Sequence, residues 1–171
     1  NVYSSRTRFF ELVINEDYKG LYLLMEQIKQ DKGRVDIAKL NPQDTVGNEI
    51  TGGYIFRLDK IEPNGSPGFY SNPSPSFPNY NPNYFQFFDP KADNMSLPQK
   101  QYIEEYLEET ESVLAGPNFA DTINGYQKYL DLNSFVDYQI INELTKNVDG
   151  YRFSTYFYKD KNNKIFAGPM W

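Results

Sequence analysis

A helix, a polar turn and a strand in immediate succession constrain the fold of this chain most strongly. Residues 131–141 place apolar side chains at helical spacing and predict an amphipathic helix, and residues 153–158 alternate and predict a strand. The polar segment Asn142–Arg152 joins the two and contains an Asn-Val-Asp-Gly sequence. A tight turn in this position holds polar groups rigidly and leaves them exposed. Asp149 and its neighbours are therefore expected to carry the function.

The absence of histidine and cysteine narrows the chemistry open to this chain. The 171 residues contain neither, which excludes Ser-His-Asp triads, cysteine nucleophiles and Cys/His zinc sites. Acid–base or metal chemistry must then use Asp, Glu, Asn, Lys, Arg or Tyr, and oxygen ligands of this kind suit Mg, Mn or Ca. A net charge of −6 argues against a nucleic-acid surface. No apolar run reaches the length of a membrane span.

The first part of the chain, residues 1–60, is rich in predicted strands. Residues 6–15 carry apolar side chains on both faces of an extended segment and predict a strand buried largely on both faces. Turn residues at 15–20 and a strand over 20–28 complete a predicted hairpin. A third strand is expected over 52–60, where paired glycines allow a bulge or a close approach of two backbones.

Residues 61–98 form the least regular part of the chain. They are rich in Pro, Asn, Ser, Tyr and Phe and predict a long loop. Within it, Tyr84–Phe88 is expected to form a short strand that returns to the sheet. The aromatic side chains of residues 68–88 either bind a glycan or a protein, or fix the loop to the body of the domain. Both interpretations are open.

Two helices are predicted between this loop and the capping residues of the last helix. Apolar side chains at helical spacing predict one over 98–114, whose glutamate-rich outer face is interpreted as solvated. A shorter helix is predicted over 118–130. Asp131 or Asn133 is expected to cap the helix that leads to Asp149.

The order of the elements predicts the fold class. Residues 99–171 combine the helices with the polar turn and a hairpin, whose strands are expected at 153–159 and 164–167. Strands first and helices later indicate an α+β protein. The whole chain, residues 1–171, has the size of a single domain.

Without histidine, the polar turn has several alternative roles. Asp149 can accept a proton from a hydroxyl group or bind a divalent cation, with Asn142 or Asn147 adding an amide oxygen. A helix, a loop containing Asp and a hairpin are also the layout of a protein-kinase catalytic segment. Many surface turns contain Asn, Asp and Gly for backbone reasons alone, so a purely structural turn is a further alternative.

Several sequence blocks run the length of the chain in a fixed order. They are Asp17–Ile28, Lys32–Ile37, Thr51–Ile55, Asn142–Glu143, Asn147–Arg152, Ser154–Lys159 and Gly168–Trp171. In these blocks the chain resembles the CotH family of bacterial spore-coat kinase-like proteins. Its Arg-Val-Asp-Ile and Gly-Gly-Tyr-Ile segments resemble the secreted modules of that family more than the compact spore form.

The resemblance implies an atypical Ser/Thr protein kinase with a reduced protein-kinase-like fold. In that fold an N-terminal antiparallel sheet precedes helices and a catalytic-loop β-hairpin. The resemblance also implies ATP bound with Mg or Mn, a protein substrate with Ser or Thr, and a location outside the cell or in the cell envelope of a bacterium. Asp149 matches the catalytic Asp of the family, and Asn147 and Asn142 are expected to support the metal.

Other positions follow from the same resemblance. Glu26 matches a family glutamate, and Arg57 or Lys60 is the expected cation facing the phosphates of ATP. Tyr54 or Phe166 is expected to line the adenine site, with a plain core role as the alternative.

The family pattern continues after Gly-Pro-x-Trp with Asp-Phe-Asp, which resembles the metal-binding segment of protein kinases. This sequence stops at Trp171 and starts inside a family strand. We therefore expect a piece of a longer protein, truncated at both ends, that transfers phosphate poorly by itself. The alternatives are a catalytically inactive kinase-like module that binds a surface glycan or protein through residues 68–88, and a structural coat protein.

Overall fold

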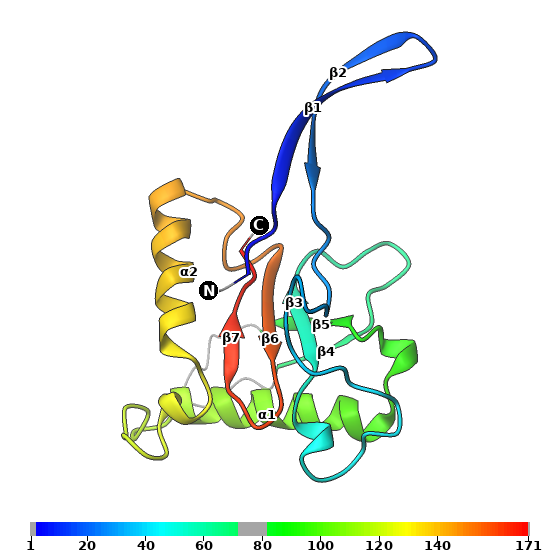
Figure 1. The fold of residues 1–171 in the computed structure, drawn as a ribbon. Coiled ribbons are helices and arrows are strands. Elements are labelled where there is room, and N and C mark those ends of the chain that lie inside the picture. The colour runs from blue at the N-terminus through cyan, green and yellow to red at the C-terminus, as the bar shows by residue number, and fades with distance from the viewer. Residues whose placement is uncertain (1–2, 72–81, 171) are drawn as a thin grey trace.

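The computed structural model describes residues 3–71 and 82–170 and shows a mixed α+β fold, as predicted (Figure 1). It contains antiparallel sheets and two α-helices. The strands are β1 (Thr7–Ile14), β2 (Asp17–Met25), β3 (Tyr54–Leu58), β4 (Gly68–Tyr70), β5 (Tyr84–Asp89), β6 (Thr155–Lys159) and β7 (Ile165–Ala167). The helices are α1 (Leu97–Ala115) and α2 (Leu132–Thr145), with short 3-10 helices η1 (Glu49–Thr51), η2 (Ala92–Asn94) and η3 (Tyr126–Lys128).

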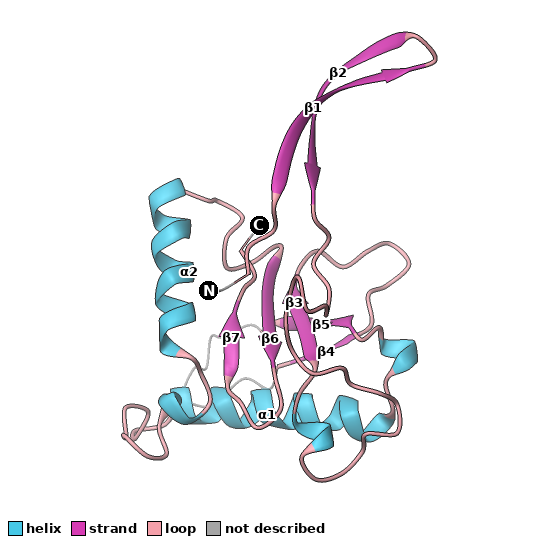
Figure 2. Ribbon diagram, viewed as in Figure 1, coloured by secondary structure: helices cyan, strands magenta, loops and turns pink. Residues whose placement is uncertain are grey.

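The central element is a five-stranded antiparallel sheet in the order β4-β5-β3-β6-β7. Its middle strand β3 comes from the first third of the chain and pairs with β6 from the last part, so the sheet joins both parts (Figure 2). Tyr54 and Phe56 on β3 pack into one cluster with Ile103 and Leu107 of α1. Ile55 points to a second cluster on the other side of the sheet. The middle strand is therefore buried on both faces.

The glycine pair before β3 marks a close approach of two backbones, as predicted. A Cβ atom on Gly52 would lie 1.9 Å from the backbone nitrogen of Lys161, in the turn between β6 and β7. Gly53 has a φ of +94°, and a Cβ atom there would lie 2.6 Å from the carbonyl oxygen of Ala38. Only glycine fits at these two positions, which seat β3 against its neighbours.

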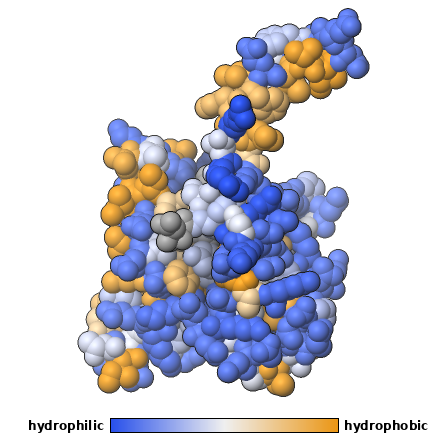
Figure 3. All heavy atoms as spheres, viewed as in Figure 1, coloured by the Kyte–Doolittle hydropathy of each residue, from blue (hydrophilic) through white to orange (hydrophobic). Residues whose placement is uncertain are grey.

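The first hairpin is paired as predicted, but its predicted burial is wrong. β1 and β2 form a separate two-stranded sheet that extends away from the rest of the domain (Figure 1). Phe9, Leu21 and Leu24 remain 69%, 66% and 62% exposed. Figure 3 shows hydrophobic side chains along this hairpin and along α2. Apolar residues on both faces indicate a strand that can be covered on both sides, but no described residue covers this hairpin.

The N-terminal antiparallel sheet that the resemblance implies is present only in divided form. The three N-terminal strands divide between two sheets, because β3 pairs with β5 and β6 and not with β2. The sequence patterns identified the strands, and the pairing depends on contacts between residues distant in sequence.

The helix predicted over 118–130 is absent. Turns and η3 occupy this stretch instead. The carboxylate of Asp121 accepts hydrogen bonds from the backbone N–H groups of Ile123 and Asn124, at 2.9 and 2.7 Å. This side-chain turn replaces helical backbone hydrogen bonds, which is a known tendency of Asp. The predicted helix over 98–114 is confirmed as α1, and Asp131 is confirmed as the cap of α2.

The long loop is more regular than predicted. Tyr84–Phe88 forms most of β5, as expected, but β4 was not predicted. Phe69 and Phe85 are buried in the main core cluster, which supports the interpretation that aromatic side chains fix this segment to the body. The aromatic residues of 72–81, Tyr80 among them, lie outside the described residues.

Lys159 on β6 is a buried cation within the core. Its side chain is among the largest fully buried ones, and the residue is 1% exposed. Its Nζ donates a hydrogen bond to the carbonyl oxygen of Thr51 and lies 4.5 Å from the ring centroid of Tyr106. It forms no ion pair with any described residue. Burial lowers the pKa of Lys159 to about 8, with Asp160 opposing this effect.

The lowered pKa of Lys159 predicts an unusual pH dependence of stability. Between about pH 8 and pH 10 the unfolded chain binds more protons than the folded one, so the free energy of unfolding rises with pH, by about 3 kcal/mol in all. Burial also raises the pKa of Tyr54 and of Tyr106, so stability falls again above about pH 10. Urea unfolding across this range measures the profile. Lys159→Met is expected to abolish the rise, and Lys164→Met to keep it; a rise that persists in Lys159→Met contradicts the assignment.

Candidate functional site

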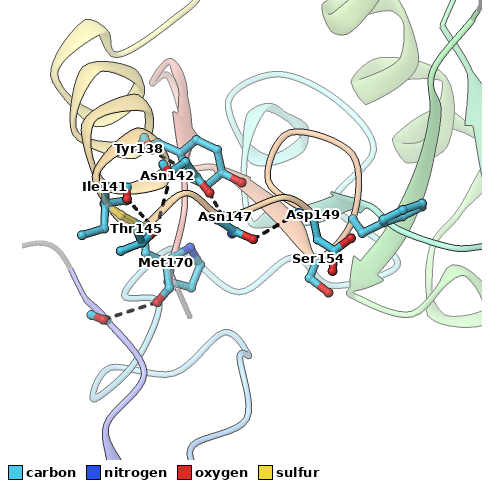
Figure 4. Close-up of a pocket in the computed structure, with 11 residues that line it drawn as sticks. Tyr138, Ile141, Asn142, Thr145, Asn147, Asp149, Ser154 and Met170 are labelled. Carbon is cyan, nitrogen blue, oxygen red and sulfur yellow. Dashed lines mark hydrogen bonds between the residues drawn. The ribbon is translucent and has the colours of Figure 1, made fainter.

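The predicted polar turn opens into a cavity of about 490 Å³ at the end of α2 (Figure 4). Its walls come from α2, from the turn, and from segments near both ends of the described chain. The lining residues are Ser4, Tyr138, Ile141, Asn142, Thr145, Asn147, Asp149, Phe153, Ser154, Pro169 and Met170. The structure thus brings together three of the predicted site residues, Asn142, Asn147 and Asp149.

A chain of amide hydrogen bonds fixes the turn to the helix. Asn142, 6% exposed, donates from Nδ2 to the carbonyl oxygen of Tyr138 at 2.8 Å. Its Oδ1 accepts a hydrogen bond from Nδ2 of Asn147 at 2.8 Å. Oδ1 of Asn147 then accepts one from the backbone N–H of Asp149 at 3.2 Å. The helix therefore sets the position of the Asp149 backbone through two side-chain amides.

Gly150 is required by the same arrangement. A Cβ atom at this position would lie 2.4 Å from Oδ1 of Asn142. Any larger residue would push the buried amide away from Asn147. The Asp-Gly pair that suggested a simple surface turn thus has a specific packing reason.

Backbone strain is concentrated around Asp149. Lys146, Tyr151 and Ser154 all have positive φ, at 52°, 70° and 50°. Non-glycine residues in this region cost roughly 1–2 kcal/mol each, so the surrounding structure must hold them there. Strain of this kind gathers at functional sites more often than in ordinary turns, so it favours a function for Asp149.

The side chain of Asp149 is exposed and lies beside Ser154 at the cavity (Figure 4). No ion pair to Asp149 occurs within the described part of the chain. Lys60 Nζ and the Arg152 guanidinium lie 5.0 and 5.2 Å from the ring centroid of Phe153, which lines the cavity. The site therefore combines an accessible carboxylate with an aromatic ring, Phe153, on which two cations pack.

Ser154 is a site residue that the sequence interpretation missed. It follows Asp149 by five positions, and a catalytic-loop Asn follows the catalytic Asp at this spacing in protein kinases. Asn also tolerates positive φ better than Ser, so Ser at φ 50° is the strained choice here. The Asp-x-x-x-x-Ser spacing was the signal that could have identified it.

The described residues do not form a metal site by themselves. No group of three or more Asp or Glu side chains suited to a metal occurs in residues 3–71 and 82–170. Asn142 and Asn147 use both their amide nitrogen and oxygen atoms to fix the turn. Among the described residues, Asp149 is the one carboxylate that lines the cavity, and Mg is usually held by one or two carboxylates together with substrate phosphates and waters.

Arg57 and Glu26 lie outside the Asp149 cavity, and each forms an ion pair with another side chain. Nη1 of Arg57 forms an ion pair with Asp59 at 3.1 Å. Glu26 accepts a hydrogen bond from Nη2 of Arg6 at 2.5 Å, and this interaction lowers the pKa of Glu26 to about 2. Neither residue lines the Asp149 cavity. Lys60 is therefore the predicted phosphate-facing cation that lies nearer to that cavity.

The two residues predicted to line an adenine site differ in accessibility. Tyr54 is buried in the core, with its hydroxyl donating to the carbonyl oxygen of Ile50, which fits the alternative core role. Phe166 lines a second cavity of about 460 Å³ and stacks on Tyr158, with ring centroids 5.1 Å apart. Pro169 lines both cavities, so the second one adjoins the Asp149 cavity.

Comparison with protein families matches residues 1–171, the whole chain, to the family described as CotH kinase protein. The chain belongs to the CotH kinase family. The predicted resemblance is thus confirmed, and membership implies a kinase-like function that uses ATP. Neither the curated proteins nor the solved structures gave a match. In the described part of this CotH family member, neither α1 nor α2 has the length and hydropathy that a membrane-spanning helix needs.

The amide chain predicts that Asn142 stabilises the turn. Asn142→Ala removes the link between Tyr138 and Asn147 and is expected to lower the free energy of unfolding by about 1–2 kcal/mol. Urea unfolding at neutral pH measures the change, and limited proteolysis reports whether the turn opens. Asn118→Ala, at an exposed position, is the matched control and should change stability little. Equal effects of the two substitutions would remove the support for this role of Asn142.

Proposed function

We propose that this chain is the core of an atypical Ser/Thr protein kinase with a reduced protein-kinase-like arrangement. Its reaction transfers the γ-phosphate of ATP to a protein hydroxyl group. The observation that carries the proposal is the exposed Asp149 carboxylate on a strained turn that Asn142 and Asn147 hold in place. Membership of the CotH kinase family supports ATP as the phosphate donor and a protein as the acceptor.

In the proposed reaction, Asp149 orients the substrate hydroxyl group and accepts its proton. The hydroxyl oxygen forms a bond to the γ-phosphorus, and the bond from that phosphorus to the β,γ-bridging oxygen breaks. ADP leaves with the electron pair of the broken bond. Catalysis of this kind is mainly positioning and charge stabilisation, so a rigid turn suits it.

The nucleotide is proposed to lie across the two adjoining cavities. Phe166 and Tyr158 offer aromatic surface for the adenine ring in the second cavity. The phosphates then extend past Pro169 toward Asp149. Lys60 is the proposed cation near the phosphates, because Arg57 is held by Asp59 and by the Tyr156 hydroxyl.

Substitution of Asp149 tests the proposal directly. Because this piece is expected to transfer phosphate poorly by itself, the variants and the wild type are compared in the longer parent protein. ATP binding is measured by calorimetry, and phosphate transfer to a Ser-containing peptide is measured with labelled ATP. Asp149→Asn keeps the shape of the side chain but removes the base, so transfer is expected to fall at least about a hundredfold with ATP binding retained. Asp137→Asn, an equivalent change on the exposed side of α2, is the matched control.

Transfer by Asp149→Asn at the wild-type rate would refute the assignment of Asp149. Absence of ATP binding by the wild-type chain would refute the kinase proposal and favour a kinase-like binding module. An observation that favours this second function is the exposed Tyr70 ring, 4.7 Å from that of Tyr84, within residues 68–88.

We also propose a location outside the cell or in the bacterial envelope, in keeping with the likeness to secreted family members.

A further inference from the structure

The base of the β1–β2 hairpin carries a cluster of cations around two adjoining hollows. One hollow, of about 360 Å³, is lined by Arg6, Arg8, Leu24 and Arg34 among others. The other is the cavity of Phe166, which Lys32 and Arg34 also line. Arg34 belongs to both. We call the set Arg6, Arg8, Leu24, Lys32 and Arg34 the hairpin-base surface.

The charge on this surface is opposite in sign to that of the protein. The chain has a net charge of −6, yet Arg8, Lys32 and Arg34 make no ion pair with any described residue. Arg34 donates one hydrogen bond, from Nη1 to the carbonyl oxygen of Gln27. The carboxylates nearby are Glu26, which is paired with Arg6, Asp36, and Asp31, which accepts a hydrogen bond from the backbone N–H of Gly33, so four cations face three carboxylates. Positive charge is therefore in excess and available to an anionic partner.

Apolar side chains continue this surface along one face of the hairpin. The register places Arg8 opposite Leu24 and Phe10 opposite Tyr22 on the same face. Leu24 is 62% exposed and Tyr22 is 45% exposed. Within residues 3–71 and 82–170, β1 and β2 pair only with each other, so each strand leaves one edge unpaired by the described chain. An extended peptide can add to such an edge, with side chains on alternating faces.

The surface leads to the Asp149 cavity. Tyr3 lines the Phe166 cavity and its neighbour Ser4 lines the Asp149 cavity. Ser4 Oγ donates a hydrogen bond to the carbonyl oxygen of Met170 at 3.3 Å, so the two cavities share this narrow wall. A polypeptide bound at the hairpin base therefore lies close to the proposed catalytic carboxylate.

We propose that the hairpin-base surface docks an extended, acidic segment of the protein substrate. The acidic side chains pair with Arg8, with Arg34 on its side toward the hollow below the hairpin, and with Lys32 at the rim of the Phe166 cavity, which leaves the Phe166 and Tyr158 rings to the adenine. Apolar side chains of the segment pack on Leu24 and the hairpin face above it. This inference rests on the proposed kinase function, because only a kinase would phosphorylate the protein that docks here. The docking itself is a binding event that can be measured without ATP.

Fluorescence anisotropy with two labelled peptides tests the docking. Both carry alternating Val and Thr residues, followed by Glu residues in one peptide and by Gln residues in the other. The acidic peptide is expected to bind at least about tenfold more tightly, and its affinity should fall as salt is raised. The double variant Arg8→Glu with Lys32→Glu should weaken binding about tenfold or more. Lys164→Glu reverses one charge in the β6–β7 turn, as each half of the double variant does at the hairpin base, and should leave binding unchanged.

Three outcomes would overturn the docking proposal. The first is equal binding of the acidic and neutral peptides, and the second is unchanged affinity in the double variant. The third is self-association through the hairpin that Leu24→Asp abolishes, because the occupant is then a second copy of the chain. Thermal unfolding of each variant confirms that it is folded.

Asp149→Asn separates this proposal from the proposed function. Acidic-peptide binding that survives in Asp149→Asn, or in a chain that transfers no phosphate, supports docking independently of catalysis. Phosphate transfer without acidic-peptide binding refutes docking and leaves the kinase proposal standing.

Discussion

The pairing of β3 with β6 is the interaction on which the rest of this structure depends. It places Tyr54 opposite Lys159 and Leu58 opposite Thr155, and so joins segments that are far apart in the sequence. Closing so large a loop costs chain entropy, which the burial of β3 on both faces offsets. Because β6 begins directly after Ser154, the same pairing anchors one end of the Asp149 turn. Helix α2 anchors the other end through Asn142.

A turn fixed at both ends can keep a strained backbone that a free loop would relax. The positive φ values around Asp149 are therefore a product of the fold and not of the turn sequence alone. The same rigidity holds the carboxylate at the cavity, where no described residue forms an ion pair with it. For phosphate transfer this matters, since a carboxylate already committed to an internal ion pair is a poorer acceptor for a substrate proton.

Much of the fold and part of the site could be predicted from local patterns. The apolar spacing of α1, the Asp131 cap and the Asn-x-Asp-Gly turn are properties of short segments, and each was found where expected. The failures concern contacts between distant segments. Nothing local shows that residues 7–25 project from the domain, or that the Asp121 side chain would replace a helical turn. Phe166 and Tyr54 are both aromatic strand residues, and only tertiary packing separates an accessible ring from a core one.

The projecting hairpin also has a consequence for how this domain behaves in solution. A two-stranded ribbon with open edges and uncovered apolar side chains is a template for pairing with any other exposed strand, including that of an identical molecule. Two features of the hairpin oppose repeated strand-to-strand pairing of this kind. A bulge between Leu12 and Val13 breaks the regular register, and the tip bears the charged pair of Asp17 and Lys19. The hairpin is thus open to a partner that fits one face, yet poorly shaped for the endless stacking of strands that produces fibres.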